Sequence, residues 1–336
     1  MSKSINYWII NNPYHINDIE LYNSKYEGEN CFIAIEHRKI TFDKSDKVYY
    51  FQNFKGFYWF IINLFKLRIR LKKIGIREID RIFVFNGQEQ TNNILLSIIA
   101  KKYCNNIIIV DDGSSGYQFY LTDPVYSNRF SDIVRKLFFK FFGVKYDVMR
   151  ACNLYYLCLH RSYVKKIIFP YLVSYEGSIE VECFQRKFDN EITLNEKHAV
   201  FISQPFYLCD PGYLSFDSYT EMLEKILRIL CAKYEKVFLK LHPNDHPSLS
   251  SLLSLKAIPN FELIEGEHIF EKIIHNLAVK NLISFNSNAL LTSFGSNHET
   301  IWLYKLVSEQ CTIDFKYLNY IVPNNNGKII EQFTQI

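Results

Sequence analysis

The sequence predicts an α/β protein of two successive domains, each built around a parallel β-sheet. Short apolar runs typical of buried strands alternate with stretches of helical periodicity. This alternation stops in a polar, charged segment near residues 186–195 and then starts again. The chain of 336 residues also exceeds the usual size of one compact domain and suits two. We therefore expect domains over residues 1–185 and 196–336, joined by a linker at 186–195.

The first half contains four apolar runs that we expect to form strands, at residues 7–10, 31–35, 82–85 and 106–110. A helix is expected over residues 91–103, because apolar side chains recur there on one wide face. The order strand, helix, strand favours parallel pairing.

The second half repeats this rhythm without repeating the sequence. Strands are expected at residues 199–203, 237–241 and 281–285. A helix is expected over 218–234, and a helical turn should begin at Ala289. Because ligands of open α/β sheets bind beyond the carboxyl ends of the strands, the polar clusters at those ends are the candidate functional residues.

Composition narrows the function classes. Lys and Arg number 39 against 35 Asp and Glu, an excess too small to predict a nucleic-acid-binding protein. The 48% of hydrophobic residues excludes a disordered chain. None of the eight cysteines has the spacing of a metal ligand, which favours reduced thiols in the cytoplasm. We recognise neither a signal peptide nor a stretch of about 18 apolar residues that could span a membrane.

Two adjacent carboxylates, Asp111 and Asp112, follow the strand expected at 106–110, with Gly113 next. A carboxylate at a strand end is well placed to accept a proton from a sugar hydroxyl. The same three residues are also typical of a polar turn in which glycine supplies a positive φ. The motif alone leaves both interpretations open.

Polar groups also end two strands of the second half. Lys240 and His242 lie on the same side of one strand by alternation, with Pro243 following, and could bind a phosphate or a nucleotide carbonyl. The residues from Ser284 to Asn288 join a strand to a helix, where Ser287 could help to bind an anion or could simply cap the helix.

Two further segments are weaker candidates. Asn12 and Pro13 follow the first strand, in a loop that either touches substrate or forms a plain turn. Glu265 and Glu267 precede an expected helix, where a carboxylate either holds a ribose diol or favours the helix dipole.

In this order the motifs resemble those of bacterial sialyltransferases of the GT-B class, particularly glycosyltransferase family 52 and the related polysialyltransferases. Their acidic-acidic-Gly, His-Pro and Ser/Thr motifs correspond to residues 111–113, 242–243 and 284–287. The opening residues 12–15 and the segment 202–206 also resemble family 52 motifs, so the resemblance covers most of the chain. Two positions depart from the pattern: Asn288 follows Ser287 where a second hydroxyl is usual, and Ser203 replaces a glycine.

The resemblance implies a GT-B fold, in which two Rossmann-like domains face each other across a cleft. The N-terminal domain would hold the acceptor and the C-terminal domain the donor, CMP-sialic acid, in a single inverting displacement. Asp111 would be the general base, with Asp112 as the alternative, and His242 would stabilise the leaving phosphate. The donor carries one phosphate, so neither a divalent metal nor a cofactor is expected.

The remaining site residues follow from the same resemblance. Lys240 and Pro243 would meet the cytosine, and Glu265 or Glu267 the ribose. Ser287, with Ser284 and Asn288 beside it, would bind the donor phosphate. Asn12, Pro13 and Gly113 would lie on the acceptor side or in the cleft. The acceptor would be a lipooligosaccharide or capsule glycan that ends in a galactoside or a sialoside.

Two stretches combine basic and aromatic residues, at 53–77 and 129–145. This pattern fits an anionic membrane surface, and equally fits helices that pack their aromatic side chains inward and leave a solvated basic face. Peripheral contact with the inner face of the cytoplasmic membrane and homodimer formation therefore stay open, whereas nucleic-acid binding is not expected.

Three other functions compete with sialyl transfer. One is transfer of another CMP-activated acid such as Kdo, and a second is a CDP-polyol phosphotransferase of the teichoic-acid type. The third is a non-catalytic glycan-assembly protein, which the presence of the Asp, His and Ser residues disfavours. Release of CMP with formation of a glycosidic bond would separate the first from the second.

Overall fold

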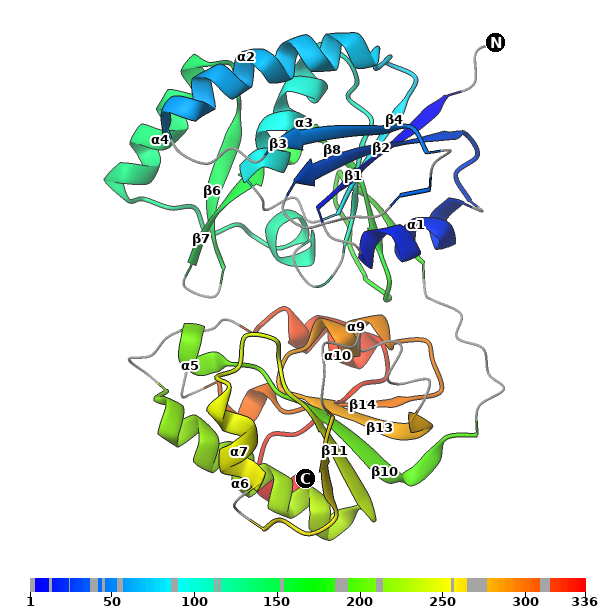
Figure 1. Ribbon diagram of the computed structural model, residues 1–336, viewed down its shortest axis with the longest axis vertical. Helices are drawn as coiled ribbons and strands as arrows, with labels where there is room; N and C mark the ends of the chain where they lie inside the picture. The colour runs from blue at the N-terminus through cyan, green and yellow to red at the C-terminus, as the bar shows by residue number, and fades with distance from the viewer. Residues whose placement is uncertain are drawn as a thin grey trace. The chain divides into compact units, whose positions relative to one another are not determined.

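The computed structural model divides the chain into two compact units, which are described separately (Figure 1). Met1–Phe169 and Ser174–Cys183 form the first unit, and Pro170–Val173 and Phe184–Ile336 form the second. The structure describes all residues except 1–3, 12–13, 24, 37–41, 44–45, 53–56, 86–89, 112, 114–115, 152–153, 185–192, 210–213, 255–256, 265–276 and 309–314.

The first unit is built on a seven-stranded sheet of order β3-β2-β1-β4-β5-β8-β9, in which every neighbouring pair is parallel. The strands are β1 (Ile5–Ile10), β2 (Glu29–Glu36), β3 (Val48–Gln52), β4 (Arg81–Phe85), β5 (Ile107–Val110), β8 (Val164–Phe169) and β9 (Glu180–Cys183). The central strands β1, β4 and β5 are almost wholly buried, which explains their continuous apolar sequences.

Helices cover both faces of this sheet. The helix α1 (Tyr14–Asn23) lies on one face, and α2 (Phe57–Ile74) and α3 (Gln90–Lys102) lie on the other (Figure 1). The chain crosses the sheet in one direction from β1 to β2 and in the opposite direction from β3 through β4 to β5. Because crossovers between parallel strands are right-handed, the helices of these two parts lie on opposite faces of the sheet.

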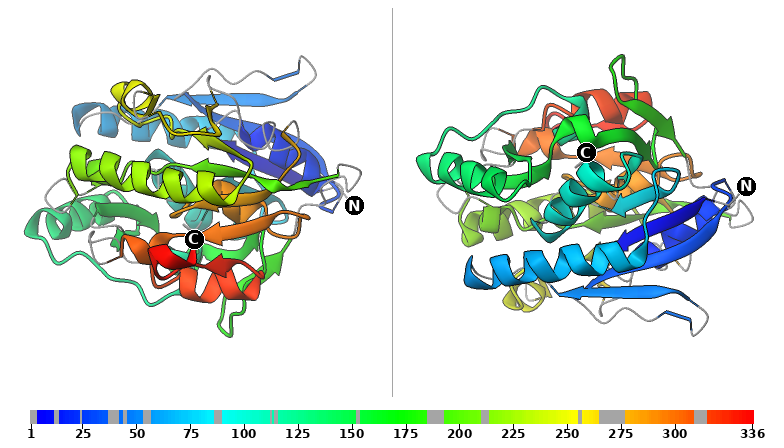
Figure 2. Two further views of the ribbon diagram at one scale, coloured as in Figure 1. Left: turned by 90° about the horizontal axis from the view of Figure 1, so that it is seen from below. Right: turned by 90° about the horizontal axis from the view of Figure 1, so that it is seen from above.

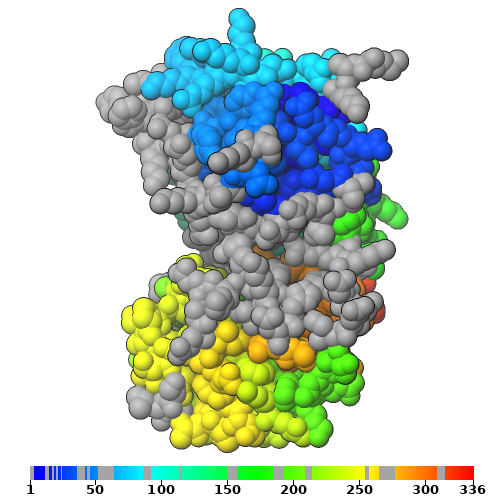
Figure 3. Space-filling model, turned by 45° about the vertical axis from the view of Figure 1, so that its right-hand side comes forward, coloured from blue at the N-terminus to red at the C-terminus, as the bar shows by residue number. Residues whose placement is uncertain are grey.

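The helix α2 contains the longest apolar run of the sequence and ends in two lysines, Lys72 and Lys73. Its C-terminal half lies at the surface of the first unit, in light blue in Figure 3. Leu64, Leu67 and Leu71 form its buried face. Within the described part of the chain, no helix combines the length and the apolar character that crossing a bilayer requires.

An insertion between β5 and β8 adds an outer layer to the first unit. It contains α4 (Phe130–Phe141) and an antiparallel hairpin of β6 (Tyr146–Ala151) and β7 (Leu154–Leu159). The side-chain amide of Asn93 in α3 donates to the carbonyl of Leu157 (2.7 Å), and the Ser97 hydroxyl donates to the carbonyl of Lys145 (2.9 Å). The hairpin therefore packs on α3, and α4 packs on the hairpin (Figure 1).

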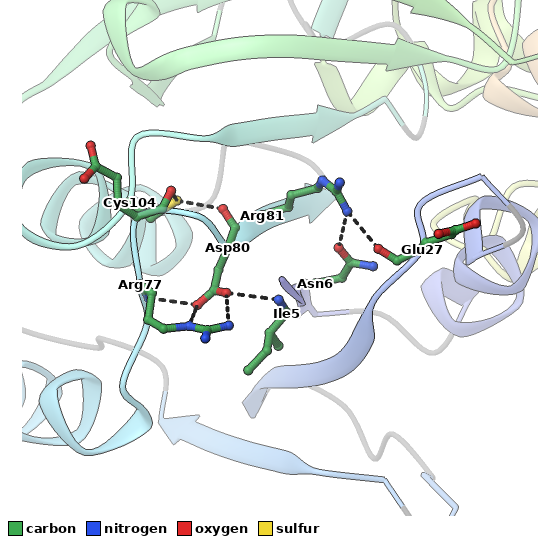
Figure 4. Close-up of polar contacts among 8 residues, drawn as sticks. Ile5, Asn6, Glu27, Arg77, Asp80, Arg81 and Cys104 are labelled. Atoms are coloured by element: carbon green, nitrogen blue, oxygen red, sulfur yellow. Dashed lines mark hydrogen bonds and ion pairs between the residues drawn. The ribbon is translucent and has the colours of Figure 1, made fainter. Parts of the chain in front are cut away.

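A buried carboxylate, Asp80, fixes the entry into β4 (Figure 4). Its oxygens accept from the backbone N–H of Ile5 (3.0 Å), from the backbone N–H of Arg77 (2.8 Å) and from the Arg77 guanidinium (2.8 Å). Burial alone would raise the pKa of Asp80, but these hydrogen bonds outweigh burial and hold the pKa below its ordinary value. The start of β1 is thereby tied to the start of β4.

The second unit contains a six-stranded parallel sheet of order β12-β11-β10-β13-β14-β15. Its strands are β10 (Asn195–Ile202), β11 (Lys236–Lys240), β12 (Phe261–Leu263), β13 (Val279–Ser284), β14 (Glu299–Trp302) and β15 (Lys328–Ile329). Its helices are α5 (Phe206–Cys209), α6 (Phe216–Lys233), α7 (Ser248–Ser254), α9 (Asn288–Thr292) and α10 (Leu318–Asn324). In Figures 1 and 2, α6 and α7 lie on one face of the sheet and α10 lies on the other.

Two details at the boundary between the units differ from expectation. The strand expected from residue 199 begins at Asn195, where exposed ion pairs such as Lys280–Glu196 (2.7 Å) extend it. The segment Pro170–Val173 belongs to the second unit, because Leu172 exchanges backbone hydrogen bonds of 2.8 and 2.9 Å with the side chain of Asn325. Most of the expected linker, 186–195, lies outside the described residues.

Candidate active site

The carboxyl ends of three adjacent strands bring the candidate donor residues together. In the second sheet, Ile202 at the end of β10 pairs with Lys240 of β11 on one side and with Ser284 of β13 on the other. The chain continues from β10 to β11 in one direction and from β13 to β14 in the opposite direction. The point between β10 and β13 is therefore the topological switch point, where ligands of such sheets bind.

His242 lies just beyond the end of β11, and a local hydrogen bond fixes its tautomer. The backbone N–H of Asn244 donates to His242 Nδ1 over 3.1 Å, so the ring proton of the neutral imidazole is on Nε2. Burial lowers the pKa of His242, the nearby Lys240 lowers it further, and Asp245 opposes both. At neutral pH the site therefore contains a neutral imidazole whose Nε2–H can donate to an anion.

Asp245 and Ser203 hold the turn that contains His242. The backbone N–H of His242 donates to the Ser203 hydroxyl oxygen (2.8 Å) and to the Asp245 carboxylate (3.0 Å), and the Ser203 hydroxyl donates to the same carboxylate. Burial raises the pKa of Asp245, and the hydrogen bond from Ser203 opposes that rise. The loops after β10 and β11 are thus joined through one half-buried cluster.

Two tyrosines extend this cluster into the helices. The Tyr207 hydroxyl in α5 donates to Asp245 (3.5 Å) and accepts from the backbone N–H of His246 (2.7 Å). The Tyr219 hydroxyl in α6 accepts from the backbone N–H of Gln204 (3.2 Å). The sequence interpretation did not include Asp245, Tyr207 or Tyr219. A Pro-Asn-Asp turn directly after His242 was the one available signal for Asp245.

At the end of β13 the predicted serines have structural partners. The Ser284 hydroxyl is fully buried and donates to the carbonyl of Ile202 (2.8 Å), which joins β13 to β10. The Ser287 hydroxyl accepts from the backbone N–H of Ala289 (3.3 Å) and caps α9. Asn288 is the exposed first residue of that helix. The capping interpretation therefore describes Ser287 in this structure.

The other predicted donor residues are only partly described. Lys240 is half-buried at the end of β11, and Pro243 is exposed beside His242. The predicted residues outside the described part of the chain are Asn12, Pro13, Asp112, Glu265 and Glu267. Among the described residues, no group of three or more His, Cys, Asp or Glu side chains is arranged to hold a metal ion.

The candidate base, Asp111, lies at a strand end in the first unit. It directly follows β5, and its backbone N–H donates to the carbonyl of Ile168 in β8 (2.9 Å). Its carboxylate Oδ1 accepts from the backbone N–H of Gly116 (2.6 Å), at the start of the π-helical turn η1 (Tyr117–Leu121). Gly113 between them is also buried. The hydrogen bond from Gly116 helps to orient the Asp111 carboxylate.

We expect Ser203→Ala to weaken the binding of CMP, the ligand that the sequence resemblance implies, by roughly threefold to tenfold, because His242 loses one of the two acceptors that hold its backbone. The free energy of unfolding should fall by about 1 kcal/mol, because the half-buried Asp245 carboxylate loses a donor. Calorimetric titration with CMP and thermal unfolding measure the two effects. Ser215→Ala is the control, because Ser215 caps α6 and should cost stability without changing CMP affinity. Unchanged CMP affinity in Ser203→Ala would show that this hydroxyl does not position His242.

Comparison with solved structures assigns the fold class. The structure is similar to a UDP-glucosyltransferase from Polygonum tinctorium, with a TM-score of 0.52 and 8% identity over 90% of this chain and 80% of that one. It is similar to the UDP-GlcNAc 2-epimerase from Methanocaldococcus jannaschii, with a TM-score of 0.50 and 10% identity over 99% and 90% of the two chains. With two all-parallel sheets, these likenesses confirm the predicted α/β fold of the GT-B class.

The family follows from the sequence match. The family model described as alpha-2,8-polysialyltransferase matches residues 6–298. The chain therefore belongs to the alpha-2,8-polysialyltransferase family and is a glycosyltransferase of the sialyltransferase kind. The GT-B domain of a sialyltransferase from Photobacterium damselae is also among the similar structures, with a TM-score of 0.47 and 11% identity over 89% of this chain and 91% of that one. A search of curated proteins finds no match. The narrower resemblance to family 52 stays a prediction.

Proposed function

We propose that this protein is an inverting, metal-independent sialyltransferase that moves sialic acid from CMP-sialic acid to a hydroxyl of a bacterial surface glycan. The observation that carries the proposal is the neutral His242 imidazole with its proton on Nε2, held beside the switch point of a parallel sheet. Family membership supplies the reaction class.

His242 would act on the leaving group. As the bond between the anomeric carbon and the CMP phosphate breaks, negative charge grows on the phosphate oxygens. A hydrogen bond from Nε2–H to one of these oxygens becomes stronger as the charge grows, which lowers the barrier. The half-buried cluster of Ser203 and Asp245 fixes the backbone of His242, so little reorganisation is needed during the reaction. The half-buried Lys240 adds positive charge near this site.

Asp111 would act on the acceptor. Its carboxylate would accept the proton of the attacking hydroxyl while that oxygen bonds to the anomeric carbon. The backbone N–H of Gly116 orients the carboxylate for this step. Because the proposed donor has a single phosphate, the proposed reaction needs neither a divalent metal nor a cofactor. Asp112 remains the alternative base.

The family description favours an acceptor that ends in a sialoside over one that ends in a galactoside. An α2,8 linkage joins one sialic acid to the next, so we propose an acceptor that ends in a sialoside rather than a galactoside. The glycan would be a capsule or lipooligosaccharide chain, made in the bacterial cytoplasm.

The decisive experiment follows CMP release from CMP-sialic acid in three mixtures: without acceptor, with an α2,8-linked oligosialic acid and with a galactoside. We expect acceptor-dependent CMP release with the oligosialic acid, equal rates with and without EDTA, and a product that is longer by glycosidically linked sialic acid. Loss of turnover in EDTA that Mg²⁺ restores would contradict the metal-independent mechanism. Turnover with CMP-Kdo only would show that the donor is CMP-Kdo and not CMP-sialic acid. A phosphodiester product from a CDP-polyol would show that the protein is a CDP-polyol phosphotransferase. Failure of every donor would favour a non-catalytic glycan-assembly protein.

A further inference from the structure

The helix α4 presents its most apolar face to solvent. Five large apolar side chains on this helix are exposed: Phe130 81%, Ile133 46%, Val134 49%, Leu137 59% and Phe141 85%. Their spacing of three, four, seven and eleven residues places them in one stripe, because an α-helix turns about 100° per residue. A surface helix of a globular domain normally turns such a stripe toward the core.

The packed face of α4 lies opposite this stripe. Its buried residues are Asp132 and Phe139, about half a turn away from Phe130. The Ser127 hydroxyl donates to Asp132 (2.5 Å), and the Phe139 ring contacts Tyr146 in β6, with 4.6 Å between ring centroids. The helix is therefore held on the hairpin by its other side, and the hairpin does not use the apolar stripe.

Positive charge flanks the stripe. Lys136 and Lys140 lie along one side of the stripe, whereas Arg135 lies nearer the packed face and pairs with Asp132 (3.7 Å), the one acid of the helix, which is buried there. Lys136 pairs with Asp147 (2.6 Å), whereas Lys140 is exposed. This combination of apolar and basic side chains would repel a basic partner. It is complementary to a surface with an apolar interior and anionic groups at its edge.

The neighbouring helix α2 also exposes apolar and basic side chains. Its Arg68 guanidinium donates to the carbonyl of Phe142 (2.6 Å), which joins α2 to the C-terminal end of α4. Phe65 and Ile69 of α2 are exposed, at 58% and 59%, with the exposed Lys66 and Arg70 beside them.

We propose that the outer face of α4 docks on a bilayer of anionic phospholipid, with the helix lying in the plane of the interface. The five apolar side chains would enter the boundary between headgroups and acyl chains, and the flanking cations would meet the phosphates. With twelve residues the helix is about 18 Å long, which suits lying on the surface and is too short to cross it. The docking goes beyond sialyl transfer and does not depend on which glycan is made.

The test is cosedimentation of the full chain with vesicles of phosphatidylglycerol and phosphatidylcholine in equal amounts, compared with phosphatidylcholine alone. The wild-type chain should bind the anionic vesicles, and added salt should weaken that binding. The double variant Phe130→Ser/Phe141→Ser should bind them roughly tenfold less, because interfacial affinity scales with buried apolar area. Lys140→Gln should lose roughly fivefold, the contribution of one basic side chain at an anionic surface.

The matched control is the double variant Ile79→Ser/Tyr320→Ser, which removes two large apolar side chains that are 54% and 63% exposed elsewhere. It should bind vesicles like the wild type. If the Phe130/Phe141 double variant folds poorly, as judged by thermal unfolding, Leu137→Ser gives the same test with a smaller expected loss. Unchanged binding of the α4 variants overturns the proposal, as does equal binding to both kinds of vesicle. Lipid-free self-association that the Phe130/Phe141 variant abolishes would also overturn it and would make this face a dimer contact.

Discussion

Asp111→Asn is expected to lower the rate of sialyl transfer by roughly 10²–10⁴-fold, the usual contribution of a positioned general base. The amide oxygen of asparagine can still accept from the backbone N–H of Gly116, so the local fold should persist. Alanine would leave that buried N–H without its acceptor and would mix a loss of stability with the loss of the base. Single-turnover rates measured beside calorimetric titration with CMP separate chemistry from donor binding, and CMP affinity should stay unchanged.

Asp132→Asn is the matched control, because Asp132 is also a buried carboxylate of the first unit but belongs to the packed face of α4. Its transfer rate should stay within about twofold of the wild type. If Asp111→Asn keeps a normal rate and Asp112→Asn is inactive, the base is Asp112. Normal rates in both variants would contradict the mechanism.

Gly116→Ala tests the orientation of the same carboxylate without touching its chemistry. Gly116 has an ordinary helical φ of −61°, so alanine causes no backbone strain. Its Cβ, however, would lie 2.9 Å from Asp111 Oδ1, which forces the carboxylate to move. Because the new Cβ would also lie 3.2 Å from Asp111 Cγ and 3.3 Å from its Cβ, and the carboxylate is buried, we expect a lower melting temperature together with a reduced transfer rate. A normal rate would show that this orientation does not matter.

The second large effect is expected at His242. His242→Ala should lower the transfer rate by roughly 10²–10³-fold, the loss typical for one hydrogen-bond donor to a developing negative charge. It should also weaken CMP binding, because the phosphate loses a partner in the ground state. His246→Ala is the control: His246 lies four residues further along, its side chain is exposed, and its Nδ1 contacts the Ser248 hydroxyl (2.7 Å) at the start of α7. Equal losses in the two variants would contradict a specific role for His242.

The pH dependence of His242 has a definite sign. Its pKa in the folded chain lies below the ordinary value of 6.5, because burial disfavours the charged ring. Below pH 6.5 the unfolded chain therefore binds more protons at this residue than the folded chain does, and stability falls as the pH falls. A pH series of melting temperatures should show this loss in the wild type and a smaller loss in His242→Ala. CMP affinity should stay level between about pH 7 and 8, where the imidazole is neutral throughout.

The strands β1, β4 and β5 could be predicted from sequence because both faces of the sheet are covered and their residues form continuous apolar runs, whereas the interior strands β8 and β14 were not expected. The expected strand at 82–85 corresponds to β4 (Arg81–Phe85), and the expected helix at 91–103 corresponds to α3 (Gln90–Lys102). The edge strand β9 and the interior strand β8 were missed because glutamates in β9 and lysines in β8 interrupt their apolar runs, whereas the short apolar run of the edge strand β3 was not recognised as a strand. The antiparallel hairpin of β6 and β7 was missed because it packs on α3 and leaves no trace in the alternation of strands and helices.

The candidate site also contains some residues that the sequence indicates and others that it does not. Asp111 and His242 were chosen as candidates from sequence because each lies at the end of a strand, Asp111 directly after β5 and His242 two residues after β11. The groups that position these two residues could not be located from sequence, because their contacts form only when loops distant in sequence meet in the folded chain. Ser203 and Asp245 are 42 residues apart in the chain and meet only because β10 and β11 are neighbours in the sheet. The departure of Ser203 from glycine looked incidental in the sequence, yet its hydroxyl contacts both His242 and Asp245.

The layered insertion of the first unit has a consequence for how this protein can change over time. The outer face of α4 is separated from the sheet by the hairpin and by α3. A substitution on that face changes no contact of β5. The surface can therefore change what it binds while the surroundings of Asp111 stay the same. Changes at the outer positions of α4 should therefore alter docking without altering the surroundings of Asp111, whereas Asn93 and Ser97, whose side chains hold the layer in place, should vary little among natural variants.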